Sequence, residues 1–383
     1  MVYFFLISIL VVYSFSYITQ TSCNRILIKK SRYELYFFLF CVISLSFIAA
    51  FRYKTGRDWV GYIRIFDLSL NSTNQLKGYE LGFVLLNHFF KTIFNDFYLM
   101  QFCIVVFSSS LIYRNFYQKS LFPVFTILLY VFRFYFQTDM AQTRQYIAMA
   151  ILAYGMVFIQ RKQIVKWILI VILATSFHIT AMVAFPLYFT TRVILKRKIC
   201  WLLFCLYIVV YIWGLDFVRG ILSVVINLPF VPSRIVSIGI SYLNSTIYGQ
   251  QGQFNSGLGF LTNIFFIIYM LITFCRKDCK KEEFYMCNFF VGLFFYAMGR
   301  NFDQFSRLAN YYMICGCGLC GYNLIIGNRS FFKQLDFIRV MISFLFIMFE
   351  VYTFQRNWFS ISPTLNTSYH LDYVPWKNFL LNK

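Results

Sequence analysis

Long apolar runs recur from one end of this chain to the other, and they constrain its fold more than any other feature. Runs such as "ELYFFLFCVISLSFIAAF" (34–51) reach the roughly 17–25 residues that a helix needs to cross a bilayer. The sequence is 60% hydrophobic and only 13% charged, too apolar for the surface of a soluble domain of 383 residues. Because the runs do not alternate, they favour helices over barrel strands. We predict an all-α, polytopic integral membrane protein.

The predicted spans form a single transmembrane domain, 1–383, with about ten full crossings. They cover 2–18, 34–51, 97–113, 121–136, 140–159, 199–215, 258–275, 284–298, 309–327 and 336–355. The first run has no basic start and no small-residue cleavage site, so we predict a helix there and no signal peptide. The run 164–190 contains a polar Thr175-Ser176 pair and Pro186. We predict a bent pair of half-helices there, turning near 176–178.

Basic loops set the predicted orientation, because short cytoplasmic loops of membrane proteins are rich in Lys and Arg. The basic loops are "NRILIKKSR" (24–32), "RNFYQK" (114–119), "QRKQIVK" (160–166) and "RKDCKK" (276–281). They account for the net charge of +21 without a nucleic-acid partner. The outer face then holds loops 52–96, 216–257 and 299–308 and a tail, 356–383. All eleven cysteines fall in spans or cytoplasmic loops, as expected if the outer compartment is oxidising.

Arginine gathers at the predicted outer ends of the spans. The residues are Arg52, Arg57, Arg144, Arg300 and Arg307. Guanidinium groups bind phosphate through two hydrogen bonds and keep their charge in apolar surroundings. A converging set that outnumbers the nearby acids therefore favours an anion, such as a lipid pyrophosphate. For any single arginine, snorkelling at a helix end or pairing with a nearby aspartate is an equally good explanation.

One histidine stands at predicted membrane depth. His178 could act as a general base, because an imidazole can accept a proton near neutral pH, or it could be a structural residue that caps the hairpin turn. Three histidines and no paired acidic motif predict no metal site. No GxxxxGK[ST] or GxGxxG motif is present, so we expect no nucleotide cofactor. The "CGCGLC" run (315–320) lies in an apolar span and favours close helix packing over metal binding.

Six segments carry a resemblance to a known family. They are "FRYKTGRDWVGYIRIF" (51–66), "GYELGFVLLN" (78–87), "RQYIAMAI" (144–151), "SFHITAMVAFPLYF" (176–189), "FSRLANYY" (305–312) and "YVPWKNFL" (373–380). In this order they resemble the EpsG-like branch of polysaccharide polymerases and, through it, the O-antigen polymerases (Wzy). The sequence departs from many relatives at Arg57, where they have Thr.

The resemblance implies a bacterial inner-membrane glycosyltransferase whose active site faces the periplasm. It would join oligosaccharide repeats carried on undecaprenyl pyrophosphate, with no metal or nucleotide sugar, and a chain-length regulator protein would be a partner. The motif residues carried over by position are Arg52, Arg57, Asp58, Arg144, His178 and Arg307. The arginines would stabilise the leaving pyrophosphate, and His178 or Asp58 would take the acceptor's proton. The alternatives are a flippase or other glycan transporter, which should show repeats that we do not find, and a membrane acyltransferase.

Overall fold

The computed structural model describes most of the chain, and within that part every regular element is helical. The described residues are 2–23, 32–53, 55–56, 58–70, 78–120, 122–193, 197–228, 283–298, 303–322 and 336–359, with single positions 236, 240 and 264. The all-α prediction is confirmed for them. The predicted span 258–275 falls outside this part, apart from position 264.

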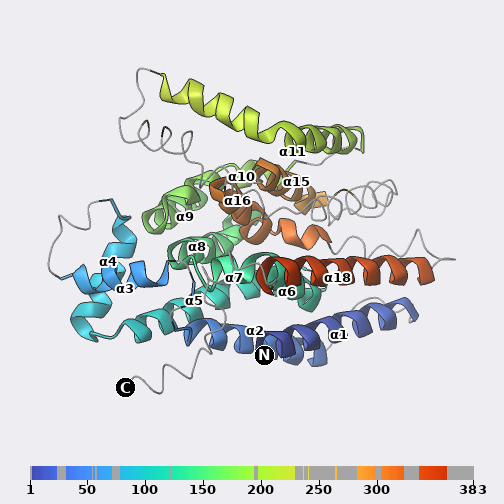
Figure 1. The fold of residues 1–383 in the computed structure, drawn as a ribbon, viewed down its shortest axis with the longest axis horizontal. Coiled ribbons are helices and arrows are strands. Elements are labelled where there is room, and N and C mark those ends of the chain that lie inside the picture. The colour runs from blue at the N-terminus through green and yellow to red at the C-terminus, as the bar shows by residue number, and fades with distance from the viewer. Residues whose placement is uncertain are drawn as a thin grey trace.

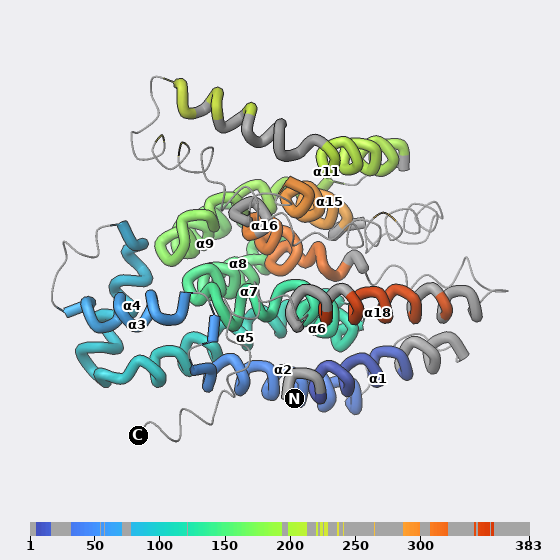
Figure 2. Tube along the Cα trace, viewed as in Figure 1, coloured from blue at the N-terminus to red at the C-terminus, as the bar shows by residue number. Residues whose placement is uncertain are grey.

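The long helices run roughly along a common direction (Figure 1). Helices α1 (Val2–Cys23) and α2 (Arg32–Ala50) lie along one side of the molecule, and α11 (Arg197–Ile226) lies along the opposite side (Figures 1 and 2). Helix α18 (Asp336–Phe359) packs on α1, and α15 (Glu283–Met298) packs on α11. Between these layers, α5 (Phe97–Lys119) packs on both α2 and α8 (Thr143–Gln160).

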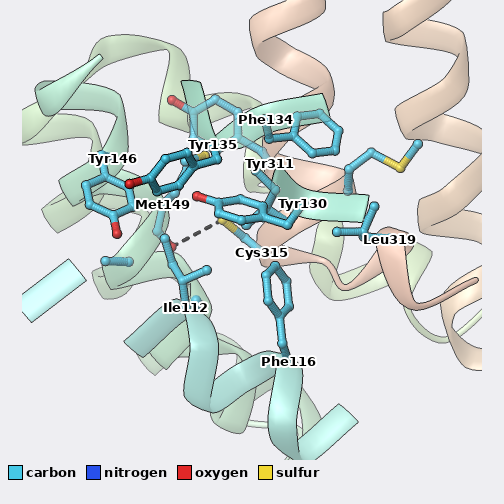
Figure 3. Close-up of a cluster of buried hydrophobic side chains, with 14 of the residues drawn as sticks. Ile112, Phe116, Tyr130, Phe134, Tyr135, Tyr146, Met149, Tyr311, Cys315 and Leu319 are labelled. Atoms are coloured by element: carbon cyan, nitrogen blue, oxygen red, sulfur yellow. Dashed lines mark hydrogen bonds between the residues drawn. The ribbon is translucent and has the colours of Figure 1, made fainter. Parts of the chain in front are cut away.

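The middle of the molecule is a core of large buried side chains from α5, α8 and two π-helical turns, 131–135 and 311–315 (Figure 3). The Cys315 thiol donates a hydrogen bond to Met149 O at 3.2 Å, which joins two of these elements. Because lipid tails are as apolar as the side chains, such packing and internal hydrogen bonds hold membrane helices together.

Two short helices cover one end of the bundle, at the left of Figure 1. They are α3 (Trp59–Leu68) and α4 (Leu81–Ile93). On α4, Phe83 and Phe90 are buried while Leu85 and Phe89 are exposed, so the helix is amphipathic, as the sequence predicts. The following helix, α5, begins where the Asp96 carboxylate accepts hydrogen bonds from the N–H groups of the next turn.

The predicted bend within 164–190 is confirmed. Helix α9 (Ile164–Phe177) ends where His178 is extended, and a 3-10 helix, η2 (Ile179–Ala184), and the short α10 (Leu187–Thr190) follow. The Tyr188 hydroxyl donates to Lys162 O at 3.0 Å, so the chain has returned to the start of α9. A continuous helix would place those two residues about 39 Å apart.

The predicted continuous span 309–327 is wrong. Its described part consists of the end of α16 (Asp303–Asn310), a π-helical turn (Tyr311–Cys315) and a 3-10 helix (Gly318–Tyr322). The break falls at Cys317, whose φ of 58° is left-handed. A Cβ at Gly316 would lie 2.7 Å from Tyr312 O, and one at Gly318 would lie 2.8 Å from the same atom. The small residues of "CGCGLC" therefore permit close packing, as predicted, but they also end the helix.

Two further boundaries differ from the prediction. The span predicted over 121–136 is divided into α6 (Pro123–Tyr130), a π-helical turn (Val131–Tyr135) and α7 (Phe136–Thr138). The loop predicted over 216–257 begins too early, because the mostly apolar stretch "ILSVVI" (221–226) continues α11 to Ile226. Among the described helices, α2 and α5 are long and apolar enough to cross a membrane by length and composition. The count of about ten spans stays a prediction.

Candidate functional site

Glu80 contacts two side chains that the sequence analysis singled out, Arg144 and His178. Its Oε2 accepts from Arg144 Nη1 at 2.6 Å, and its Oε1 lies 3.2 Å from His178 Nδ1. The backbone N–H of Ile179 also donates to Oε1, at 3.2 Å. Glu80, the residue before α4, thus connects α4 to the start of α8 and to the break after α9.

Local chain geometry holds these three groups in place. Arg144 lies in the first turn of α8, and its guanidinium carbon is 5.5 Å from the centre of the Tyr79 ring. His178 is presented by the break that ends α9. Gly82 lets α4 approach that break, because a Cβ there would lie 2.5 Å from Ser176 Oγ. The site therefore depends on how α4, α8 and the hairpin pack together.

The Glu80 contacts fix the proton arrangement on His178. Burial alone would raise the pKa of Glu80, but the hydrogen bond with His178 and the charge of Arg144 lower it to about 2. Glu80 is therefore ionised at neutral pH and can only accept hydrogen bonds. A neutral His178 must then carry its proton on Nδ1, which leaves the lone pair on Nε2. A carboxylate that orients an imidazole in this way is suited to general-base catalysis.

Arg144 has hydrogen-bonding capacity beyond its pairing with Glu80. Among the described residues its buried Nε has no acceptor. The side chain as a whole is 25% exposed, and its Nε is buried. Tyr62, buried on α3, lies beside the same guanidinium. An anion that approached the exposed part of this side chain would be attracted by its positive charge.

Arg52 and Gly56, both in the segment 51–66 that carries the family resemblance, hold the turn that leads into α8. Arg52 Nη1 donates to Asp139 O at 2.9 Å, and its Nη2 donates to Thr143 Oγ1 at 2.8 Å. Gly56 has a φ of 98°, and a Cβ on it would lie 2.3 Å from Met140 O. Arg52 is only 2% exposed. The structure thus brings Arg52 onto the 139–143 turn, directly before Arg144, and its guanidinium faces protein groups.

Asp139, in that same turn, is a buried acid whose carboxylate is satisfied internally. It accepts hydrogen bonds from the Tyr130 hydroxyl and, at 2.8 Å, from Thr138 Oγ1. The Tyr113 hydroxyl approaches it at 3.4 Å. These contacts, together with Arg52, make the turn before α8 a fixed part of the fold.

The other predicted site residues lie around this cluster or outside the described part of the chain. Asp58 precedes α3 as its N-cap residue and makes no side-chain capping hydrogen bond. Arg307, half-buried in the last turn of α16, accepts a hydrogen bond on its backbone oxygen from Gln145 Nε2 at 2.8 Å, which joins α16 to the first turn of α8. Arg57 and Arg300 lie outside the described residues, and so does most of the loop 216–257 and of the tail.

Sequence reasoning missed Glu80, the residue that links the cluster. The quoted segment "GYELGFVLLN" contains it, and a lone carboxylate beside an apolar helix was a usable signal. Thr143 was missed as a partner of Arg52, because nothing in the sequence pairs positions 91 residues apart. In the described part of the chain no three His, Cys, Asp or Glu side chains form a group suited to a metal ion.

Comparison with known proteins gives one family. The model of the EpsG family matches residues 35–365, which is most of the chain. No curated protein and no solved structure matches. Residues 52, 80, 144, 178 and 307 all fall within the matched range.

Proposed function

The chain belongs to the EpsG family of membrane proteins, which are Wzy-type polysaccharide polymerases, and on that premise we propose its reaction. It joins lipid-linked oligosaccharide repeats at the periplasmic face of a bacterial inner membrane, and the product is O-antigen or a related surface polysaccharide. Donor and acceptor are both carried on undecaprenyl pyrophosphate. The donor brings its own leaving group, so the reaction needs neither a nucleotide sugar nor a metal, and a chain-length regulator protein is the expected partner.

The observation that carries this proposal is the bridge from Glu80 to both Arg144 and His178. A glycosyl transfer of this kind needs a base for the acceptor hydroxyl and positive charge for the departing pyrophosphate. Here one carboxylate orients an imidazole and holds a guanidinium with a spare donor. Both groups lie at the same end of the bundle as the amphipathic α4.

The proposed chemistry uses these groups in fixed roles. His178 Nε2 takes the proton from the acceptor hydroxyl as that oxygen forms a bond to the anomeric carbon of the donor. The bond from the anomeric carbon to the pyrophosphate oxygen breaks, and the negative charge on that oxygen is stabilised by Arg144. Arg57, Arg300 and Arg307 are proposed to add positive charge around the same leaving group. Arg52 acts through the 139–143 turn as a positioning residue.

Asp58 is the alternative base, and substitution distinguishes it from His178. If His178 is the base, His178→Gln should be as inactive as His178→Ala, because Gln can hydrogen bond but cannot accept a proton near pH 7. Asp58→Asn should then retain activity. Full activity of His178→Gln together with loss in Asp58→Asn would transfer the role to Asp58.

Deletion of the gene tests the function as a whole. Cells that lack the protein should carry a lipid anchor capped with one repeat unit, and the ladder of longer chains should be missing on a gel. The Lys91→Gln variant is the control for substitutions in the Glu80 cluster and should keep the ladder, because Lys91 forms a 3.1 Å ion pair with Asp67 at the same end of the molecule but outside the cluster. Loss of even the single capped repeat would refute the polymerase and favour the flippase.

A further inference from the structure

A cavity lies at the opposite end of α5 and α8 from the Glu80 cluster. It has a volume of about 240 Å³. Its walls come from the last turns of both helices and from the first residue after α8: Leu111, Arg114, Asn115, Gln118, Lys119, Ala153, Tyr154, Met156, Val157, Phe158, Gln160 and Arg161. Arg161, the residue after α8, is seventeen positions beyond Arg144, which along a helix is about 25 Å. That distance approaches the roughly 30 Å of a bilayer's hydrocarbon core.

The lining of the cavity is cationic. Arg114, Lys119 and Arg161 contribute positive charge, and no lining residue is acidic. In the part of the chain that the structure describes, none of the three pairs with a carboxylate. The polar side chains beside them are amides, which can donate hydrogen bonds. Unneutralised cations around a concave space favour an anion as the occupant.

The apolar part of the lining indicates where this anion comes from. Leu111, Val157 and Phe158 stand beside the cations, and Tyr154 is 49% exposed. The volume is below the roughly 300–1,000 Å³ of pockets that enclose a whole drug-sized ligand. It suits a head group whose apolar remainder stays outside. Basic pockets between membrane helices at the cytoplasmic boundary are a known setting for acidic lipid head groups.

We infer that this cavity binds a phosphate group, carried by an anionic phospholipid of the membrane leaflet opposite the Glu80 cluster. Arg114 and Arg161 supply planar forks for two phosphate oxygens, and Lys119 supplies a further positive charge. Asn115 is 5% exposed and is held by a hydrogen bond to Cys315 O at 3.3 Å, so a bound lipid would brace α5 and α8 against the 311–315 turn. The inference does not depend on the reaction at the other end.

The test measures lipid retention by the full chain. The protein is purified in detergent, exchanged into mixtures of phosphatidylcholine and phosphatidylglycerol, and examined by native mass spectrometry. Phosphatidylglycerol should be enriched on the wild type. Arg114→Gln with Arg161→Gln should lower that enrichment at least ten-fold, because hydrogen bonds to charged groups are strong. Lys162→Gln with Lys198→Gln removes the same charge outside the cavity lining and should leave it unchanged.

A second variant keeps every charge. Val157→Phe adds volume at a half-buried position of the wall and should also expel the lipid. Titration with inorganic phosphate, followed by phosphorus NMR, separates a lipid from a free phosphate compound as the source. Binding of phosphate that the Arg114 and Arg161 substitutions abolish would support the phosphate site with a soluble ligand. Equal loss in the two double variants, or no enrichment of phosphatidylglycerol and no phosphate binding by the wild type, would overturn the inference.

Discussion

Replacing Glu80 with Gln removes one charge and almost no volume. The carboxylate accepts from three donors, on Arg144, His178 and Ile179. An amide offers a single accepting oxygen, and its NH₂ group must face one of those donors. Arg144 then loses its counter-charge, and His178 is no longer held in one tautomer by an obligate acceptor. We expect the variant to fold with lower stability and to lose turnover.

The size of both effects follows from the geometry. Breaking a fully buried ion pair costs about 3–5 kcal/mol. The Arg144 and Glu80 side chains are 25% and 13% exposed, so solvent screens the pair, and we expect a loss of about 1–3 kcal/mol. Loss of an oriented general base lowers a rate by roughly 10²–10⁴-fold. The polymer ladder should therefore disappear, although most of the protein remains folded.

Thermal unfolding of the purified protein and gel analysis of the polysaccharide measure the two effects. Asp67→Asn is the matched control, because it makes the same chemical change in a pair whose acid is 61% exposed. Such a pair contributes about 0–1 kcal/mol, and the ladder should persist. A double-mutant cycle of Glu80→Gln with Arg144→Gln should give a coupling of about 1 kcal/mol or more. If Glu80→Gln matches the wild type in both stability and ladder, the assigned role of Glu80 is wrong.

Three more predictions follow from the same contacts. Arg144→Lys should insert and fold normally but lose the polymer ladder. Arg52→Lys should lose the ladder and also lower the melting temperature, because one ammonium cannot reach the acceptors on both Asp139 and Thr143. Equal melting temperatures for the two variants would contradict the assignment of Arg52 as a positioning residue. Gly56→Ala should destabilise the protein by about 1–2 kcal/mol or more, because Gly56 has a left-handed φ and a Cβ there would lie 2.3 Å from Met140 O. Gly61→Ala is the control: it has open space around it in α3 and should be neutral or stabilise the protein by up to about 1 kcal/mol. Similar melting temperatures for the two variants would refute the structural role of Gly56. The folded-state pKa of Glu80 is lowered to about 2, so the contribution of ionised Glu80 to stability is fully present above about pH 4.5 and is lost as the pH falls toward 2. The melting temperatures of the wild type and Glu80→Gln should therefore converge over that interval. A constant difference would show that ionised Glu80 is not the source of the extra stability.

The sequence by itself determined that the chain is helical and has the apolar runs of a membrane protein. Apolar runs of membrane length and a near absence of internal charge leave helices as the way to satisfy the backbone. The break at His178 was also predictable, because the polar Thr175-Ser176 pair and Pro186 favour a bend in that run. The resemblance to the EpsG family was visible in short ordered motifs, and the family match over residues 35–365 confirms it.

The tertiary structure decided which polar groups meet. Arg52 and Arg144 look alike in the sequence, but the fold buries Arg52 against the 139–143 turn and leaves the Arg144 side chain partly exposed beside Glu80. Glu80 and His178 are 98 residues apart, and no local pattern encodes their contact. A periodic pattern reports which face of a helix is apolar, whereas the partner of a polar side chain depends on how distant helices pack. The proposed roles of Arg52 in positioning and of Arg144 in anion binding therefore depend on how α2, α4, α8 and the hairpin pack together.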